Sequence, residues 1–170
     1  MKIDKNQYAP FYETYISKSL KRGDDIIKNM QSSLEDFFLI LSDIPVEKQL
    51  FTYDKDKWTI KELIVHLIDT ERIMAYRALR ISRNDKVDLL SFDENYFIAN
   101  SIANAIPFIE LLKEFSLVRK SNIAMFKGFD EEILQRRGRA SGSEITVSAL
   151  GFILSGHVFH HLDVIKERYL

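Results

Sequence analysis

The chain lacks cysteine altogether, and this absence excludes several kinds of chemistry. A protein without thiols forms no disulfide, offers no thiolate to a metal and has no cysteine nucleophile. Such a composition also fits a reducing compartment. The sequence contains no apolar run approaching the roughly 20 residues that a membrane-spanning helix needs, and its first residues lack the apolar segment of a signal peptide. We therefore predict a cytoplasmic protein that does not associate with membranes.

An excess of charge of either sign is missing as well. The 24 Lys and Arg residues nearly balance the 25 Asp and Glu residues, which leaves a formal net charge of -1. Without a basic field, nucleic acid is not an expected partner. A chain of 170 residues that is 46% hydrophobic can bury one substantial core, so we predict a single domain over residues 1–170.

The alternation typical of strands is not sustained anywhere, whereas helical periodicity is prominent. Apolar residues recur at steps of three and four in four segments, near 24–41, 59–83, 103–126 and 148–169. Thr59 with Glu62 three residues later fits a capping box at the start of the second segment, and Thr146 is a candidate N-cap for the last. These features predict an all-α protein, namely a four-helix bundle.

The segments outside these helices give less regular patterns. Residues 1–22 hold an aromatic cluster around a proline, which we expect to cap one end of the core. Residues 84–100 are predicted to form an irregular crossover and residues 135–143 a flexible basic loop. Arg119 and Asn122 interrupt the apolar stripe of the third helix, so they face either a polar cavity inside the bundle or, more commonly, its edge.

Histidine is scarce, and its distribution is informative. Three of the four histidines fall within residues 157–161. At about 100° per residue, His161 lies about 40° from His157 on the helix surface, whereas His160 lies about 60° to the other side. The apolar residues of the helix fall mainly on the side of His161. His66 lies on the inward stripe of the second helix, so we predict that it meets His157 and His161.

Three neutral imidazoles that leave a fourth position open are a recurrent site for a divalent metal that binds water or substrate. Imidazole suits zinc, nickel, copper or iron, so the ligands do not select the metal. The alternative is a set of core histidines that hydrogen-bond to backbone or carboxylate groups. Asp69, three residues after His66, is a candidate to orient a ligand imidazole or to act as a base. His160 is assigned a supporting or surface position.

The basic loop offers one further candidate function. Arg136, Arg137 and Arg139 are close enough in sequence to steer an anionic substrate toward the site. A basic loop is, however, also a common form of solvated surface.

Several motifs together resemble the DinB-like (DinB/YfiT) superfamily over about residues 8–170. The segments that carry the resemblance are Trp58-Thr59-Ile60-Lys61-Glu62, His66-Leu67-Ile68-Asp69-Thr70-Glu71-Arg72, Tyr76-Arg77-Ala78-Leu79-Arg80-Ile81-Ser82-Arg83-Asn84-Asp85 and Gly156-His157-Val158-Phe159-His160-His161-Leu162. The resemblance implies an up-down-down-up four-helix bundle, often a homodimer, with nickel or zinc on residues matching His66, His157 and His161. The chain departs from the family pattern at Val158, where glutamate is common, and near Leu134, where a tryptophan is absent.

The resemblance also implies three candidate functions. Members are described as metal-dependent hydrolases, and related proteins are thiol-dependent transferases or isomerases that use bacillithiol, mycothiol or glutathione. The leading hypothesis is thus an S-transferase that acts on a small-molecule substrate with a low-molecular-weight thiol held on the metal. The second is hydrolysis by metal-bound hydroxide, with Asp69 as base. The third is a stress-associated bundle without catalytic activity, in which the metal serves stability or ligand sensing.

Overall fold

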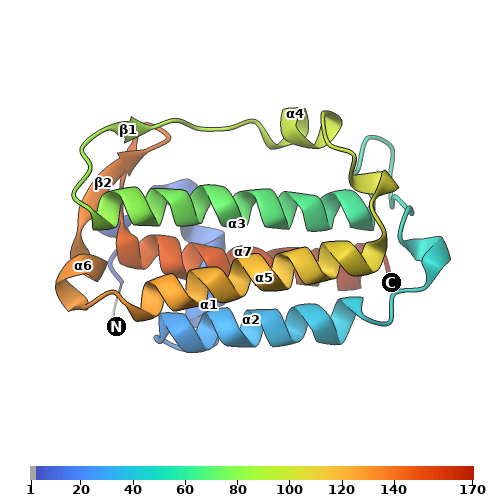
Figure 1. The fold of residues 1–170 in the computed structure, drawn as a ribbon, viewed down its shortest axis with the longest axis horizontal. Helices are drawn as coiled ribbons and strands as arrows, with labels where there is room; N and C mark the ends of the chain where they lie inside the picture. The colour runs from blue at the N-terminus through green and yellow to red at the C-terminus, as the bar shows by residue number, and fades with distance from the viewer. Residues whose placement is uncertain (1–2) are drawn as a thin grey trace.

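The computed structural model describes residues 3–170 and is built around four long helices. The helices are α2 (Ile26–Leu41), α3 (Ile60–Ser82), α5 (Phe108–Lys127) and α7 (Val147–Arg168). In Figure 1, α2 and α7 run in one direction, and α3 and α5 run in the other. The predicted four-helix bundle with up-down-down-up topology is confirmed.

The starts of these helices follow from their capping residues. The Thr59 hydroxyl accepts a hydrogen bond from the Glu62 amide, and the Glu62 carboxylate accepts one from the Thr59 amide, as the predicted capping box requires. Thr146 caps α7 by accepting from the Ala149 amide, also as predicted. Because each cap satisfies amides that have no partner in the first turn, the sequence defines where α3 and α7 begin.

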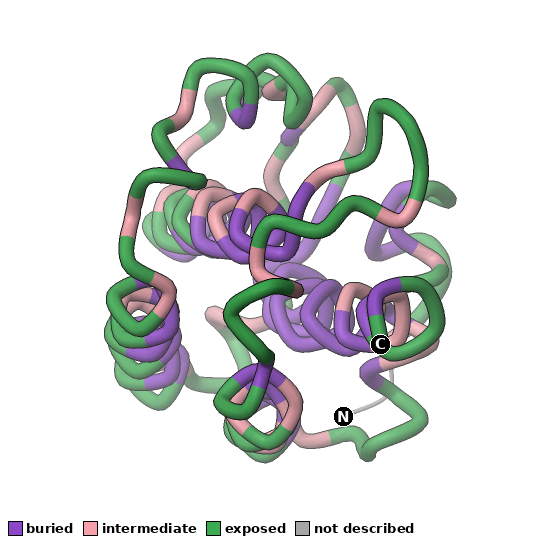
Figure 2. Tube along the Cα trace, turned by 90° about the vertical axis from the view of Figure 1, so that its right-hand side faces the viewer, coloured by how far each residue is buried: buried purple, intermediate pink, exposed green. Residues whose placement is uncertain are grey.

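Helix α7 is the centre of the bundle. It packs against α1 (Glu13–Leu20), α2 and α3, and every residue from 147 to 159 is buried. Figure 2, which looks along the bundle, shows the long helices buried on the sides that face one another. A helix that is apolar around its whole circumference belongs in the middle of a core. This position places His157 deep inside the molecule.

The core consists of two apolar clusters with a polar layer between them. One cluster includes Met30, Ile81 and Phe152, and the other includes Phe37, Leu63 and Ile165. Along the four long helices, the buried polar residues in this layer include Ser33, His66, Thr70, Glu71, Arg119, Asn122 and His157. The candidate site therefore belongs to an internal layer of the bundle and not to its ends.

The N-terminal segment differs from its prediction. After two 3₁₀ turns, Lys5–Gln7 and Pro10–Tyr12, α1 lies alongside α7 and does not cap one end of the core. Glycine permits this close approach, because a Cβ at Gly156 would overlap the Tyr15 carbonyl oxygen. The Ser19 and Ser155 hydroxyls are hydrogen-bonded at 2.7 Å across the same interface.

A small sheet occupies one end of the bundle, where the prediction of a loop over residues 135–143 was wrong. Its strands are β1 (Asp88–Leu89), β2 (Arg137–Ala140) and β3 (Ser143–Thr146), in that order, with β2 and β3 antiparallel. Ser141 and Gly142 form the two-residue turn, with φ of 55° and 75°. Positive φ at both positions matches the twist of a hairpin. The short helix α6 (Glu131–Gln135) precedes β2.

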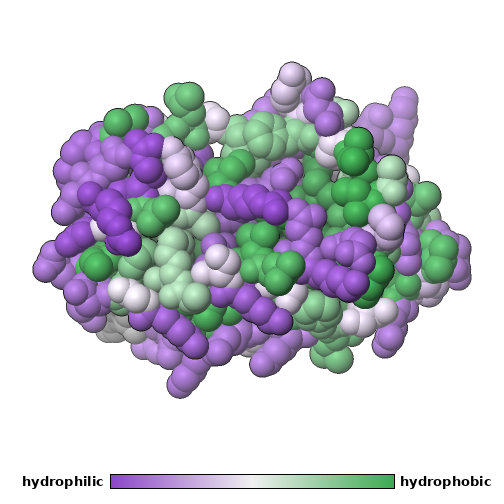
Figure 3. All heavy atoms as spheres, viewed as in Figure 1, coloured by the Kyte–Doolittle hydropathy of each residue, from purple (hydrophilic) through white to green (hydrophobic). Residues whose placement is uncertain are grey.

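The remaining connections are mostly short helical turns. The predicted crossover contains α4 (Glu94–Ala99), the 3₁₀ turn Ala103–Ala105 follows it, and Val46–Lys48 form a turn between α2 and α3. Figure 3 shows apolar side chains gathered over the part of the surface that contains α4. Exposed apolar residues in and beside the crossover include Val87, Leu90, Phe97 and Ile102. Within residues 3–170, no helix combines the length and the apolar character needed to cross a membrane.

Candidate metal centre

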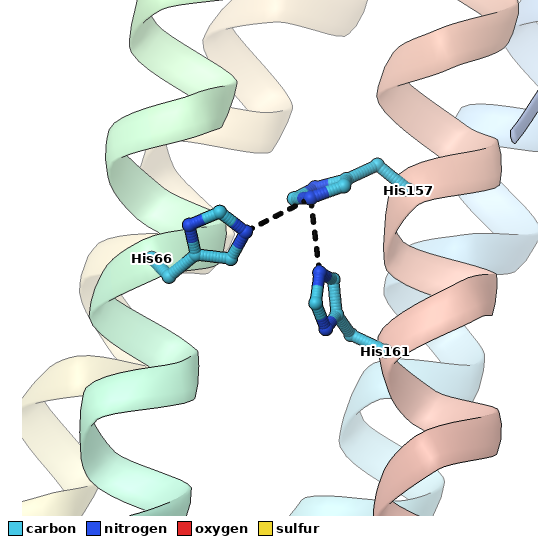
Figure 4. Close-up of side chains that lie close together, drawn as sticks. All are labelled: His66, His157 and His161. Atoms are coloured by element: carbon cyan, nitrogen blue, oxygen red, sulfur yellow. Dashed lines mark hydrogen bonds between the residues drawn. The ribbon is translucent and has the colours of Figure 1, made fainter. Parts of the chain in front are cut away.

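Three histidines from two helices converge inside the bundle. His66 projects from α3, and His157 and His161 project from successive turns of α7, so that the three rings point toward one another (Figure 4). The Nε2 atom of His157 lies 3.0 Å from that of His66 and 3.0 Å from that of His161. The structure thus brings together the three histidines that the sequence singled out.

This arrangement fits a metal ion better than a hydrogen-bonded cluster. The Nε2 atom of His157 is either one donor or one acceptor, so it cannot form a full hydrogen bond with both neighbouring ring nitrogens at once. Nitrogens that bind one tetrahedral zinc ion at about 2.0–2.1 Å lie roughly 3.3 Å apart. The observed separations are close to that value, and one ligand atom from each histidine lies within 4.8 Å of the others. The residues present can therefore hold a divalent cation.

The protonation state of the site also suits a cation. Burial, with a smaller contribution from the neighbouring His160, lowers the pKa of His66 to about 4. Burial likewise holds the pKa of His157 and of His161 well below the usual value, with a smaller contribution from the other histidines. The imidazoles are thus neutral at physiological pH, and their lone pairs are free for a metal.

Aromatic side chains fix the orientation of the rings. Tyr15 of α1 packs edge-on against His157, with 5.1 Å between ring centroids, and Trp58 lies 4.7 Å from His66. His160 is half-buried against Tyr15 and His161 and lies outside the group of converging nitrogens. Its assignment to a supporting position is thus consistent with the geometry.

Two cavities reach the histidines from different sides. The larger, about 540 Å³, is lined by all three histidines together with residues of α1, α3 and the crossover, including Tyr15, Thr70, Arg77 and Glu94. The smaller, about 290 Å³, is lined by His160, His161, Tyr53 and Tyr169. Trp58, Asn95 and His161 belong to the walls of both. The two cavities therefore meet at His161.

Asp69 lies away from the histidine site. It lines a separate cavity with Arg72 and Glu114, and it is absent from the walls of the two cavities that reach the histidines. Burial raises the pKa of its carboxyl group, and the positive charge of the nearby Arg72 offsets part of this increase. At about 100° per residue, Asp69 lies about 60° from His66 in the direction opposite to Thr70, and its side chain lines the other cavity.

The three arginines of the predicted basic loop belong to the region around the hairpin. Arg136 donates to the Ser82 carbonyl and to Glu132, Arg137 to the Asn6 carbonyl, and Arg139 to the Gly142 carbonyl. None of the three lines either histidine cavity. In this position they tie the hairpin to neighbouring segments, and their steering of a substrate remains a prediction.

Arg119 and Asn122 occupy the less common of the two positions that the sequence allowed, inside the bundle and not at its edge. The Arg119 side chain is 0% exposed and forms an ion pair with Glu71 at 2.8 Å. Asn122 donates to the Glu71 carboxylate, and Arg119 also donates to Ser33 and to the Leu154 carbonyl. The group lies inside the bundle because each charge meets an opposite charge or a hydrogen-bond partner.

The polar residues that line the larger cavity beside the histidines were not predicted. Thr70 and Arg77 lie four and eleven residues after His66, which places them on the same side of α3. The helical spacing was therefore available as a signal. Ser141 had no comparable signal, because the β2–β3 turn brings it to the cavity.

Comparison with known proteins agrees with the fold. The family model of the DinB superfamily matches residues 30–165. YfiT from Bacillus subtilis, described as a probable metal-dependent hydrolase with an unusual four-helix bundle topology, is structurally similar, with a TM-score of 0.69 and 13% sequence identity. The alignment covers 98% of this chain and 90% of YfiT. No curated protein sequence matches the chain. Because the family model spans most of its length, the chain belongs to the DinB superfamily.

Proposed function

We propose that the protein is a divalent-metal-dependent S-transferase that joins a low-molecular-weight thiol to an electrophilic small molecule. The observation that carries this proposal is the meeting of two cavities at the histidine site. A transfer reaction needs two organic molecules beside the same reactive centre, and each cavity is large enough to receive part of one. Zinc and nickel both suit the imidazole ligands.

The residues of the chain have distinct roles in this proposal. His66, His157 and His161 bind the ion and leave a coordination position for the cosubstrate. When bound, the ion supplies a Lewis acid that lowers the pKa of a thiol. Because the chain contains no cysteine, the sulfur has to arrive with the cosubstrate. Trp58 and Tyr15 hold the rings in place and limit the access of water.

Hydrolysis is the second candidate, and the similarity to YfiT favours it. A hydrolase commonly needs a carboxylate that accepts a proton from water beside the metal. Each cavity has one carboxylate in its wall, Glu94 in the larger and Asp56 in the smaller, and both residues are exposed. In this version Glu94 replaces Asp69 as the candidate base, because Asp69 lines a different cavity.

Product formation with and without thiol separates the two functions. Zinc-loaded or nickel-loaded protein is incubated with 1-chloro-2,4-dinitrobenzene and with bacillithiol, mycothiol or glutathione, and products are identified by mass spectrometry. In the expected reaction a C–S bond forms, chloride leaves with the bonding electrons, and the thiol proton passes to solvent. His157→Ala should abolish the enzymatic rate.

A different pair of results would favour hydrolysis over transfer. No enzymatic conjugate with any thiol, together with His157-dependent hydrolysis of p-nitrophenyl acetate in the absence of thiol, would replace transfer with hydrolysis. The family resemblance also leads us to propose a homodimer, which sedimentation equilibrium of the metal-loaded protein would test.

A further inference from the structure

Arg77 is a buried cation in the wall of the larger cavity. The residue is 2% exposed, and its guanidinium donates to the Leu90 carbonyl at 2.7 Å, the Ser141 hydroxyl at 2.9 Å and the Tyr12 hydroxyl at 3.3 Å. All of these acceptors are neutral. Within residues 3–170, no carboxylate lies at ion-pair distance from Arg77, and Glu94 in the same cavity wall is exposed.

A buried charge without a counter-ion is unusual, since moving a charge out of water is unfavourable unless an opposite charge compensates. The chain itself provides the comparison. Arg119, also buried, is paired with Glu71 at 2.8 Å. Where Arg119 meets a carboxylate, Arg77 faces a cavity. The missing negative charge can therefore come from a ligand in that cavity.

The position of Arg77 relates this charge to the histidines. His66, Thr70 and Arg77 follow one another along one side of α3 and line the same cavity. Eleven residues of helix separate His66 from Arg77, which corresponds to about 16 Å along the axis. Between them, the Thr70 hydroxyl is buried and has no hydrogen-bond partner among the described residues 3–170. The surrounding wall includes the apolar side chains of Met74, Phe92 and Ile153.

We propose that Arg77 and Ser141 form a subsite for the carboxylate of an extended ligand whose other end reaches the histidine site. In this arrangement Thr70 donates a hydrogen bond to a polar group in the middle of the ligand. The Arg77 guanidinium supplies the opposite charge for a carboxylate, and the Ser141 hydroxyl that accepts from it can donate its own hydrogen to a carboxylate oxygen. The carboxylate subsite at Arg77 and Ser141 does not depend on the proposed function, whereas the contact at the histidine end rests on the proposed thiol-dependent function.

A series of ligands that differ in length and charge tests both ends. The probes are ω-mercaptoalkanoic acids from 3-mercaptopropionate to 11-mercaptoundecanoate, with ω-mercaptoalkanols of equal length as uncharged controls. Affinity for cobalt-loaded protein is measured by calorimetry, and sulfur coordination is followed by the thiolate-to-cobalt absorption band. For chains long enough to bridge the site, the acids should bind about 10- to 100-fold more tightly than the alcohols.

Variants separate the charge from the fold. Arg77→Met should remove the preference for acids over alcohols but leave the cobalt absorption band, and Arg77→Lys should retain part of the preference. If Arg77→Met fails to fold, the acid-versus-alcohol comparison in the wild type still decides the question. Equal binding of acids and alcohols at every length would overturn the subsite.

Metal-free protein separates this proposal from the proposed function. Decanoate should bind metal-free wild type more tightly than decanol does, and Arg77→Met should abolish the difference. If metal-free protein prefers decanoate to decanol while no thiol produces the absorption band with cobalt-loaded protein, the carboxylate subsite stands and the thiol-dependent function fails. If decanoate and decanol bind equally, the subsite is contradicted whatever the thiols do.

Discussion

Two groups of buried polar side chains lie in the same internal layer of the bundle, and they are built in opposite ways. Around Arg119, a cation meets the carboxylate of Glu71, and Asn122 and Ser33 supply further hydrogen bonds. Around His157, three identical neutral rings direct their Nε2 atoms at one another. The first group is balanced within the chain, whereas the second could hold a metal ion.

The difference shows how buried polarity separates structure from function. A buried ion pair whose partners are all present is expected to hold α2, α3, α5 and α7 in one arrangement, and it offers nothing to a substrate. A set of converging lone pairs is unfavourable by itself and favourable with a cation. Substitutions in the first group should therefore change stability, and substitutions in the second should change metal binding.

The largest effect on stability is expected from Glu71→Ala. It leaves the Arg119 charge buried without a counter-ion, which should lower the free energy of unfolding by about 3–5 kcal/mol. Urea denaturation of the metal-free protein measures this change. Glu114→Ala is the matched control, because it breaks an exposed ion pair with Arg72 and should change stability by less than about 1 kcal/mol. Similar losses in the two variants would contradict the importance of the buried pair.

A second test concerns the dependence of stability on pH. The pKa of His66 is about 4 in the folded protein and about 6.5 when unfolded, so the unfolded chain binds the proton more tightly. The resulting stability is present above pH 6.5 and is lost as the pH falls toward 4. The loss attributable to His66 should be about 3 kcal/mol in metal-free protein.

His66→Asn should therefore show a shallower fall in unfolding free energy over this pH range than the wild type. Urea unfolding at several pH values between 4 and 8 provides the comparison. An identical pH dependence in the two proteins would mean that His66 is not held neutral by burial.

A smaller effect is expected from the contact between α1 and α7. In Gly156→Ala, the added Cβ meets the Tyr15 backbone, and α1 has to move. The free energy of unfolding should fall by about 1–3 kcal/mol, and zinc affinity should weaken because Tyr15 packs against His157. In the control Gly128→Ala, the nearest atom is 3.4 Å away. No difference between the two variants would show that α1 does not support the site.

The smallest effect is expected from Asp69→Asn. Since Asp69 lines a different cavity, the variant should bind zinc as the wild type does and differ in stability by less than about 0.5 kcal/mol. Zinc titration and thermal unfolding measure both quantities. A clear loss of zinc affinity would restore Asp69 as a residue that orients a ligand imidazole.

The bundle and the three histidines followed directly from the sequence, because they depend on local rules. Helical periodicity defined the helices, Thr59 and Thr146 marked two helix starts, and the spacing of His157 and His161 placed both on one side of α7. These features involve residues within one or two helical turns of one another. Only the approach of His66 to α7 required a tertiary contact, and its place on an inward stripe predicted it.

The errors concern features that depend on contacts between distant segments. The strands β2 and β3 have four residues each, which is too short for an alternating pattern to stand out. In addition, β2 pairs with β1, although the whole of α5 lies between these two strands in the sequence. The sequence left Arg119 between the interior and the edge of the bundle, because its partner Glu71 lies on another helix. The assembly of Arg77 with Ser141 depends on the hairpin in the same way.

The central claim is that His66, His157 and His161 bind one divalent ion, and its most direct test is zinc titration of chelator-treated protein. Calorimetry should give one ion per chain for the wild type and for His160→Ala, and no high-affinity binding for His66→Ala or His157→Ala. All four proteins should remain folded, as judged by circular dichroism. Absence of stoichiometric binding by the wild type, or undiminished binding by the His66 and His157 variants, would contradict the account.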